Sequence, residues 1–200
     1  MPEAREDRKA VHDERTRRFV IDATKELIKT EGLEPLSTRR IADAASFAVG
    51  TLYNYFADYS AILAHVAAEY LDEVHAAVLH DVEGIDDIAA RVRQATRSYA
   101  GYFLQNPEAF KLVFMAPIAP IPDGLEQSLL IPRVALLIHD WFVQAGEAGL
   151  IPSHQSELIE DVLGSTVHGM LLLHITGRSP VTAETLLERM DEAVRLLLPG

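Results

Sequence analysis

The stretch IADAASFAVGTLYNYF, residues 41–56, governs how the rest of this sequence is interpreted. At about 100° per residue, Ala48, Leu52 and Phe56 share one face of a helix, and we expect that face to be buried. The remaining surface carries small and polar-tipped residues: Gly50, Thr51 and Asn54 on the opposite side, with Tyr53 and Tyr55 on the flanks. The stretch therefore predicts a helix that is anchored by apolar residues and presents a polar face to a partner.

A short alanine-rich helix and a tight turn precede this helix, which is the helix-turn-helix pattern that docks on DNA. Gly50 inside a helix costs roughly 1 kcal/mol relative to alanine, and the close approach of a sugar-phosphate backbone would offset that cost. Threonine, tyrosine and asparagine can donate hydrogen bonds to phosphate oxygens, and asparagine can also pair with adenine. The alternative interpretation is a core helix with exposed tyrosines.

Helical periodicity continues in both directions, and no segment alternates convincingly as a strand. Ser37 and Asp58 are placed to cap the helices on either side of the opening stretch, and Pro132 is expected to bend or restart a later helix. The predicted helices span residues 13–30, 37–45, 48–56, 58–82, 85–104, 107–115, 125–148, 155–177 and 182–198. The predicted fold class is therefore all-α, with three short helices followed by five or six long ones.

Charge is distributed unevenly between the two predicted domains. Residues 1–57 are predicted to form a helix-turn-helix domain, with residues 1–12 as a flexible arm, and residues 58–200 form a larger helical domain. Residues 1–56 contain ten basic and ten acidic residues, so the net charge of −12 lies entirely downstream. The helix-turn-helix domain is neutral overall and contains clustered arginines, whereas the larger domain is acidic. This distribution is compatible with binding of a polyanion by the helix-turn-helix domain alone.

Composition excludes several functional classes. The chain has no cysteine, which excludes disulfides, thiolate metal sites and a cysteine nucleophile. Its charged N-terminal run is unlike a secretory signal, and its longest apolar run, Met170 to Leu173, is too short to cross a bilayer. We expect a soluble, cytoplasmic protein without a membrane partner.

The segment LSTRRIADAASFAVGTLYNYFADYSAIL, residues 36–63, resembles the DNA-binding signature of the TetR (tetracycline-repressor-like) family of transcriptional regulators. By motif, the resemblance covers about residues 14–65. It implies a helix-turn-helix domain followed by a helical effector-binding and dimerisation domain, and no cofactor. It also implies a homodimer, formed through the last two long helices, that represses from a palindromic DNA operator and is released by a small molecule.

The resemblance and the helix geometry together indicate which residues face DNA. Tyr53 is the first expected phosphate contact, and Thr51 is the next. The full expected set is Arg39, Arg40, Ala48, Val49, Gly50, Thr51, Tyr53, Asn54, Tyr55 and Tyr59.

Several positions depart from the family pattern. Ser46 stands where the family mostly has glycine, Ala48 where a capping serine is common, and Tyr59 where a lysine usually meets phosphate. The helix over residues 48–56 has no basic residue, so phosphate attraction would come from helix N-termini and from Arg15, Arg17, Arg18, Arg39 and Arg40. We therefore expect weaker or more salt-sensitive DNA binding than in a lysine-bearing relative. The alternative is a TetR-like ligand- or protein-binding dimer that has lost operator binding.

Aromatic residues are concentrated in the larger domain, where a pocket between long helices would bind the effector. The expected effector-binding residues are Tyr99, Phe103, Phe114, Trp141 and His168, although an aromatic stripe at helical spacing also fits a plain core. The small residues Gly164, Ser165 and Gly169 would allow close contact between helices at the dimer interface.

A metal site or an enzyme is the remaining alternative. His65, Glu69, Asp72 and His75 recur about one turn apart on the helix over residues 58–82, as metal ligands could. Apolar residues define roughly the opposite face, so we interpret these four as a solvated face. No serine, histidine or aspartate lies in a recognisable nucleophile motif, and we expect neither a metal nor catalysis.

Overall fold

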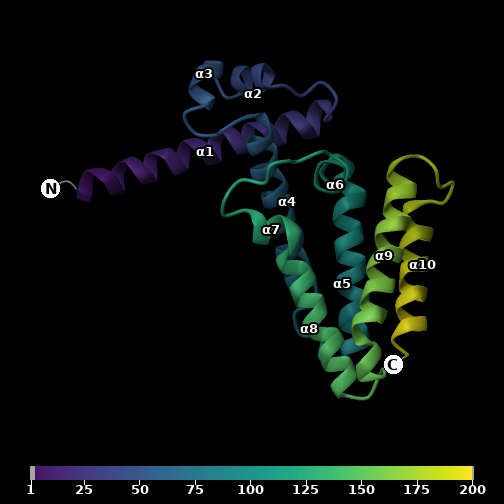
Figure 1. The fold of residues 1–200 in the computed structure, drawn as a ribbon. Helices are drawn as coiled ribbons and strands as arrows, with labels where there is room; N and C mark the ends of the chain where they lie inside the picture. The colour runs from purple at the N-terminus through teal and green to yellow at the C-terminus, as the bar shows by residue number, and fades with distance from the viewer. Residues whose placement is uncertain (1–2, 200) are drawn as a thin grey trace. The chain divides into compact units, whose positions relative to one another are not determined.

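The computed structural model describes residues 3–199, and this part of the chain is helical with no strand (Figure 1). The elements in chain order are α1 (Glu3–Glu31), α2 (Thr38–Ala44), α3 (Val49–Leu52), α4 (Tyr59–Asp81), α5 (Ile88–Gln105), α6 (Pro107–Phe114), α7 (Glu126–Leu130), α8 (Arg133–Glu147), the 3₁₀-helix η1 (Ser153–Gln155), α9 (Ser156–Ile175) and α10 (Ala183–Leu197). The all-α class predicted from the sequence is confirmed.

The first helix is longer than predicted. It begins at Glu3 rather than at Asp13, and so it includes most of the segment for which we expected a flexible arm. Residues 1 and 2 of that predicted arm lie outside the described residues. Hydrophobic periodicity does not indicate this extension, because residues 3–12 are rich in charge and lack the apolar stripe that marks a buried helix face.

The third helix is shorter than predicted, since it ends at Leu52 rather than near Phe56. The backbone continues in turns, with the Tyr55 amide donating to the Leu52 carbonyl at 2.9 Å. Ala48 provides no side-chain cap, and Gly50 lowers the helix propensity of so short a segment. One regular turn therefore carries the exposed residues, and a looser turn follows it.

The predicted caps on either side are confirmed. Ser37 is the N-cap of α2, and its hydroxyl accepts from the Arg40 amide at 3.4 Å. Asp58 Oδ1 accepts from the Ala61 amide at 2.8 Å at the start of α4. Each side chain satisfies one of the backbone donors that a helix start leaves unpaired.

The turn between α2 and α3 is closed by a Schellman arrangement of hydrogen bonds. The Phe47 amide donates to the Ala42 carbonyl at 2.8 Å, and the Ser46 amide donates to the Asp43 carbonyl at 3.1 Å. This closure places Ser46 in the left-handed region, with φ of 57°. Glycine is the usual residue at this position because it adopts positive φ without a steric penalty.

The described residues form two compact units. The first contains the chain up to Tyr70 together with residues 108–129, and the second contains residues 71–107 and the chain from Leu130 onward. Glu108 joins the returning segment to α1, because its Oε2 accepts from the Leu33 amide at 3.1 Å. Apolar side chains fill each core: Val20, Ile28, Ile41, Leu52 and Ile62 in the first unit, and Phe103, Phe142, Leu171, Met190 and Val194 in the second.

Pro132 divides the helix predicted over residues 125–148, as expected. The chain breaks between α7 and α8, and Pro132 stands at the N-cap of α8, where its missing amide hydrogen costs nothing. The other long helices begin and end within a few residues of the predicted limits.

Candidate nucleic-acid interface and ligand cavity

Two apolar side chains fix α3 to the first unit. Leu52 is fully buried and Phe56 nearly so, and the Phe56 ring meets the His65 ring edge-on at 5.5 Å between centroids. Ala48 does not join this buried face, contrary to the prediction. It is exposed because it precedes the helix and has an extended backbone with ψ of 146°.

The opposite surface of α3 is open. Val49, Gly50, Tyr53 and Asn54 are exposed, with Tyr53 at 47% of its possible area, while Thr51 is half-buried. A Cβ placed on Gly50 would have no described atom within 4 Å, so packing inside the chain does not require glycine there. The polar residues that the sequence assigned to this face therefore lie together and accessible.

The expected DNA contacts at the edges of this surface are more enclosed. Tyr55 is half-buried, and its carbonyl accepts from Arg17 Nε at 3.2 Å. Tyr59 is also half-buried; its hydroxyl donates to the Leu36 carbonyl at 3.4 Å, and burial raises its pKa. Both residues brace the domain in addition to any outward role.

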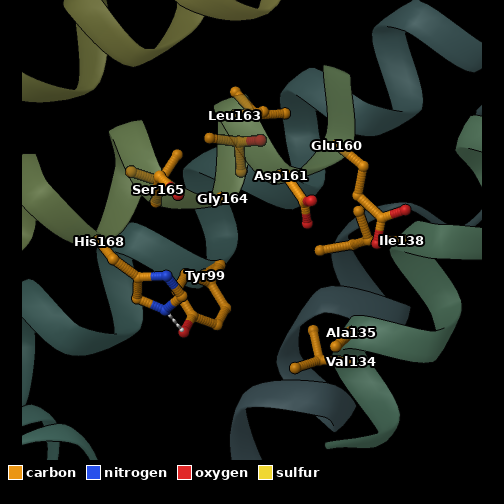
Figure 2. A pocket seen from close by; sticks show the side chains of 12 residues that line it. Tyr99, Val134, Ala135, Ile138, Glu160, Asp161, Leu163, Gly164, Ser165 and His168 are labelled. Atoms are coloured by element: carbon orange, nitrogen blue, oxygen red, sulfur yellow. Dashed lines mark hydrogen bonds between the residues drawn. The ribbon is translucent and has the colours of Figure 1, made fainter. Parts of the chain in front are cut away.

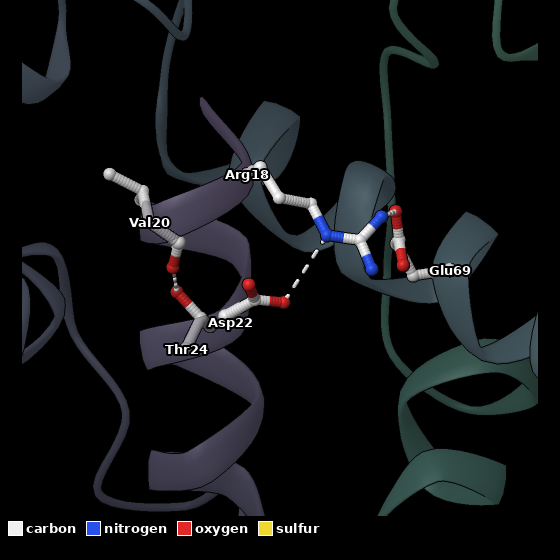
Figure 3. A network of polar contacts seen from close by, with 5 residues as sticks. All are labelled: Arg18, Val20, Asp22, Thr24 and Glu69. Atoms are coloured by element: carbon white, nitrogen blue, oxygen red, sulfur yellow. Dashed lines mark hydrogen bonds and ion pairs between the residues drawn. The ribbon is translucent and has the colours of Figure 1, made fainter. Parts of the chain in front are cut away.

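The arginines from which we expected phosphate attraction are partly engaged within the first unit. Arg40 pairs with Glu31, and Arg17 NH1 lies 3.6 Å from Glu14. Arg18 pairs with Glu69 at 2.7 Å and with Asp22 at 3.4 Å, and in Figure 3 its guanidinium lies between the two carboxylates. The opening expectation thus overstated the charge available from this cluster.

Arg15 and Arg39 differ from these three arginines. Both are exposed, and neither forms an ion pair with any residue that the structure describes. They are the members of the predicted cluster whose charge is fully available to an external polyanion.

A contact between two residues distant in sequence supports the turn between α2 and α3. The Phe19 and Phe47 rings meet edge-on at 6.2 Å between centroids, and Phe19 remains 52% exposed. The structure places Phe19 on the flank of α1 beside the start of α3. Only the packing of α1 against the turn could reveal this role.

The second unit contains a cavity of about 310 Å³ between α5, α8 and α9 (Figure 2). Tyr99 and His168 line it, joined by a 2.7 Å hydrogen bond between the phenol oxygen and Nε2. Burial raises the pKa of Tyr99 above its ordinary range and lowers the pKa of His168. The two groups therefore face the cavity in their neutral forms.

The other three residues expected to bind an effector lie outside this cavity. Phe103 is fully buried in the core, and Trp141 is buried beneath the Arg91 guanidinium, which lies 5.7 Å from its ring centroid. Phe114 belongs to the first unit, where it is exposed beside Phe110. Sequence composition placed aromatic residues in the larger domain but could not separate a cavity wall from core packing.

The four α4 residues that could have held a metal do not converge. Within residues 3–199, no group of three or more histidine or acidic side chains is arranged to hold a metal ion. His65 instead packs against Phe56, and its pKa is lowered mainly by burial and then by nearby Arg17.

The geometry defines the class of this protein. A short exposed helix follows a tight turn after α2, is anchored by buried leucine and phenylalanine, and belongs to an all-helical chain. This is the construction of a helix-turn-helix DNA-binding protein.

Comparison with known proteins supports this class. Residues 20–66 match the family model described as bacterial regulatory proteins, tetR family. The HTH-type transcriptional repressor KstR of Mycobacterium tuberculosis is 28% identical over 188 residues, covering 91% of this chain and 80% of that protein. An uncharacterised HTH-type transcriptional regulator of Haemophilus influenzae is 26% identical over 144 residues, covering 72% of this chain and 73% of that protein.

The same fold occurs in solved structures of TetR-family regulators. The regulator PfmR from Thermus thermophilus is 19% identical, with a TM-score of 0.67, over 90% of this chain and 97% of that one. Residues 20–66 therefore match the DNA-binding domain of the TetR family of bacterial regulatory proteins, and the chain as a whole resembles transcriptional regulators of that family. The family consists of regulators rather than enzymes.

Proposed function

We propose that this protein is a homodimeric repressor that binds a palindromic operator and is released from it by a small molecule. The observation that carries the proposal is the exposed polar surface of α3, which Leu52 and Phe56 fix within the family-matched domain. The resemblance to a protein named as a repressor supports repression rather than activation. We also propose the functional division at residues 57 and 58, with DNA binding before it and effector binding and dimerisation after it.

Unpartnered apolar surface on the last two helices supports the homodimer. Leucine and valine side chains lie exposed along α9 and α10: Leu158, Val162, Leu172, Leu173 and Leu196, with Leu196 at 82% of its possible area. A Cβ placed on Gly164 or Gly169 would have no described atom within 4 Å. Small residues beside apolar ones allow two copies of the pair to pack as a four-helix interface.

The segment Ser153–Ile175 is also long and apolar enough to cross a membrane by length and composition alone. It contains Glu157, Glu160 and Asp161, whose burial in hydrocarbon would be costly. Contact with a second copy explains the exposed apolar side chains of α9 without that cost.

The cavity beside Tyr99 and His168 supports an effector site. Its volume is at the lower end of the range typical for small-molecule pockets, and apolar atoms form most of its surface. Effector binding in this cavity would change the affinity for DNA only if the effector bound more tightly to one of two conformations of the protein.

The decisive experiment is selection of DNA by the purified full-length protein from a pool of random duplexes. We expect an enriched sequence with two inverted half-sites, and a complex with two protein chains per duplex by light scattering. Enrichment of no sequence would support the alternative, a TetR-like dimer that has lost operator binding. Enrichment of a single half-site bound by one chain would contradict the dimer.

A further inference from the structure

The N-terminal part of α1 carries a segregated pattern of charge. Arg8, His12, Arg15 and Phe19 follow one another at spacings of four, three and four, so they share one helix face, and Lys9 lies about 90° round the helix from it. All of these residues are exposed. Asp13 and Glu14 point to the other side of the helix, so positive charge is concentrated on one flank. We call Arg8, Lys9, His12 and Arg15 the basic face.

The packing of α1 places this face next to the recognition surface. Phe19, on the same flank, meets Phe47 in the turn that leads into α3. Figure 1 shows α1 continuing past α2 and α3 toward the N-terminus. The basic face is therefore on the side of α1 where α3 begins, displaced along the helix axis.

The rest of the DNA-binding surface offers little free positive charge beyond Arg39. No basic residue lies in α3, and Arg17, Arg18 and Arg40 are held by carboxylates. Lys9 and Arg15, by contrast, form no ion pair with any residue of the described chain. DNA affinity depends strongly on the number of phosphates that Lys and Arg neutralise.

We propose that the basic face of α1 binds the phosphates of double-stranded DNA that flanks the half-site read by α3. This inference rests on the proposed operator binding. Each chain of the dimer would then cover more DNA than its helix-turn-helix alone, and the flanking contact would contribute affinity without selecting sequence.

The test compares the double variant Lys9→Gln/Arg15→Gln with the wild type on the selected operator, with natural flanks and with flanks trimmed to the half-sites. The control Arg133→Gln/Arg178→Gln removes the same charge from exposed positions in the second unit. We expect the double variant to lose roughly tenfold in affinity at low salt, to show a salt slope smaller by about 2, and to be insensitive to trimming. The control should match the wild type.

Unchanged affinity and salt slope in a variant with wild-type thermal stability would overturn this inference while leaving operator binding intact. An equal loss in the control would attribute the effect to net charge and would also contradict it. Stronger binding to phosphatidylserine vesicles than to flanked DNA, abolished by the double variant, would assign the face to a lipid surface instead. Failure of the wild type to select DNA would instead refute the proposed function.

A second, independent observation concerns the polarity of the cavity in the second unit. His168 lies within hydrogen-bond reach of the Gly164 backbone, and the partner one turn earlier on a helix is the carbonyl. A proton on Nδ1 donated to that carbonyl leaves Nε2 as an acceptor, so the Tyr99 hydroxyl donates to it. The remaining lone pairs of the Tyr99 oxygen then face the cavity as acceptors.

The other polar side chains of the wall also accept. Glu160 and Asp161 supply carboxylates, as Figure 2 shows, and Glu160 is joined to His139 at 2.8 Å from outside the wall. The Thr96 hydroxyl donates its proton to the Val92 carbonyl at 2.8 Å. No lysine or arginine lines the cavity. Ser165 is the one hydroxyl of the wall with a proton still available.

We infer that the cavity takes an apolar molecule with a protonated amine, placed between the carboxylates of Glu160 and Asp161. This deepens the proposed effector site by naming the class of its ligand. A carboxylate of the same length would meet acceptors and the charge of Asp161, since no lysine or arginine lines the cavity and His139 is already paired with Glu160 from outside the wall.

Decylamine, decanol and decanoate, matched in chain length, test this class by thermal shift of the DNA-free protein. We expect decylamine to stabilise most, decanol less and decanoate not at all. Asp161→Asn should reduce the response to decylamine to that of decanol, while Asp86→Asn, an exposed aspartate outside the cavity, should leave it unchanged.

A larger shift with decanoate, or an unchanged decylamine shift in Asp161→Asn, would overturn the ligand class. Because DNA is absent from this assay, stabilisation by decylamine without release of the operator would count only against the proposed release mechanism.

Discussion

At the scale of single residues, the DNA-binding domain contains residues that suit their backbone positions and one, Ser46, that does not. Leu52 and Phe56 are buried as the apolar spacing requires, and Ser37 and Asp58 cap the neighbouring helices. Ser46, in contrast, adopts a positive φ that glycine would adopt more easily. The turn between α2 and α3 therefore contains a residue that lowers the stability of the folded protein relative to glycine.

Ser46→Gly is expected to stabilise the protein. It removes the steric penalty of the left-handed conformation and keeps both turn hydrogen bonds, and the more flexible unfolded chain offsets part of the gain. The free energy of unfolding should rise by up to about 1 kcal/mol, as measured by urea denaturation. Ser46→Ala, which keeps the penalty, is the control, and an equal gain in both variants would contradict the explanation.

Tyr53→Phe is expected to weaken operator binding without altering the fold. Tyr53 is exposed and its ring makes no contribution to the buried core, so loss of the hydroxyl removes only a hydrogen bond to DNA, worth about 1 kcal/mol or roughly fivefold in affinity. Fluorescence anisotropy on the selected operator measures the change. Wild-type affinity in the variant would show that the phenol does not reach a phosphate.

At the scale of elements, α3 is the least regular part of the domain. It has one turn of regular helix and an N-cap, Ala48, without a capping side chain. Its C-terminal turn depends on long-range support, because Arg17 donates to the Tyr55 carbonyl. The position of α3 thus derives from its buried anchors and from α1 more than from its own propensity.

Ala48→Ser is expected to stabilise α3. The extended backbone of residue 48 suits an N-cap, and a serine hydroxyl there can accept from a backbone amide of the first turn. The gain in the free energy of unfolding should be about 0.5–1 kcal/mol by chemical denaturation. Ala48→Val, which adds bulk without an acceptor, should give no gain; similar stabilisation by valine would exclude capping as the cause.

At the scale of the whole molecule, the chain joins a compact DNA-binding unit to a larger unit with a cavity and an unpartnered apolar surface. Neither unit is a continuous piece of sequence, since residues 108–129 belong with the N-terminal unit. The homodimer proposed above would cover the exposed apolar side chains of α9 and α10.

Val162→Arg is expected to convert the proposed homodimer to a monomer. An arginine on this α9 surface would place a charge within an apolar two-fold contact, where its own symmetry mate would repel it. Sedimentation at micromolar concentration should then detect mainly the single chain. Leu130→Arg replaces an apolar residue that is 66% exposed outside α9 and α10, and it should leave the dimer intact. A monomeric control would indicate non-specific loss of structure instead.

Sequence alone determined the features that depend on local rules. Periodicity identified the α-helices, although α1 was predicted too short, α3 too long, and α7 and α8 as one helix. Capping side chains marked two of the helix starts, and the motif over residues 36–63 identified the DNA-binding domain. These predictions succeeded because helix propensity, helix caps and the buried apolar stripe of a helix are encoded by residues a few positions apart. The charged start of α1 was missed because it lacks an apolar stripe.

Tertiary structure decided which residues share a surface. It placed Arg18 between Asp22 and Glu69, assigned Phe19 to the turn, and separated Tyr99 and His168 from the buried aromatics around them. Each outcome depends on contacts between residues distant in sequence, where burial and charge pairing compete across elements. Periodicity reports which face of a helix is apolar, whereas only packing determines what that face meets.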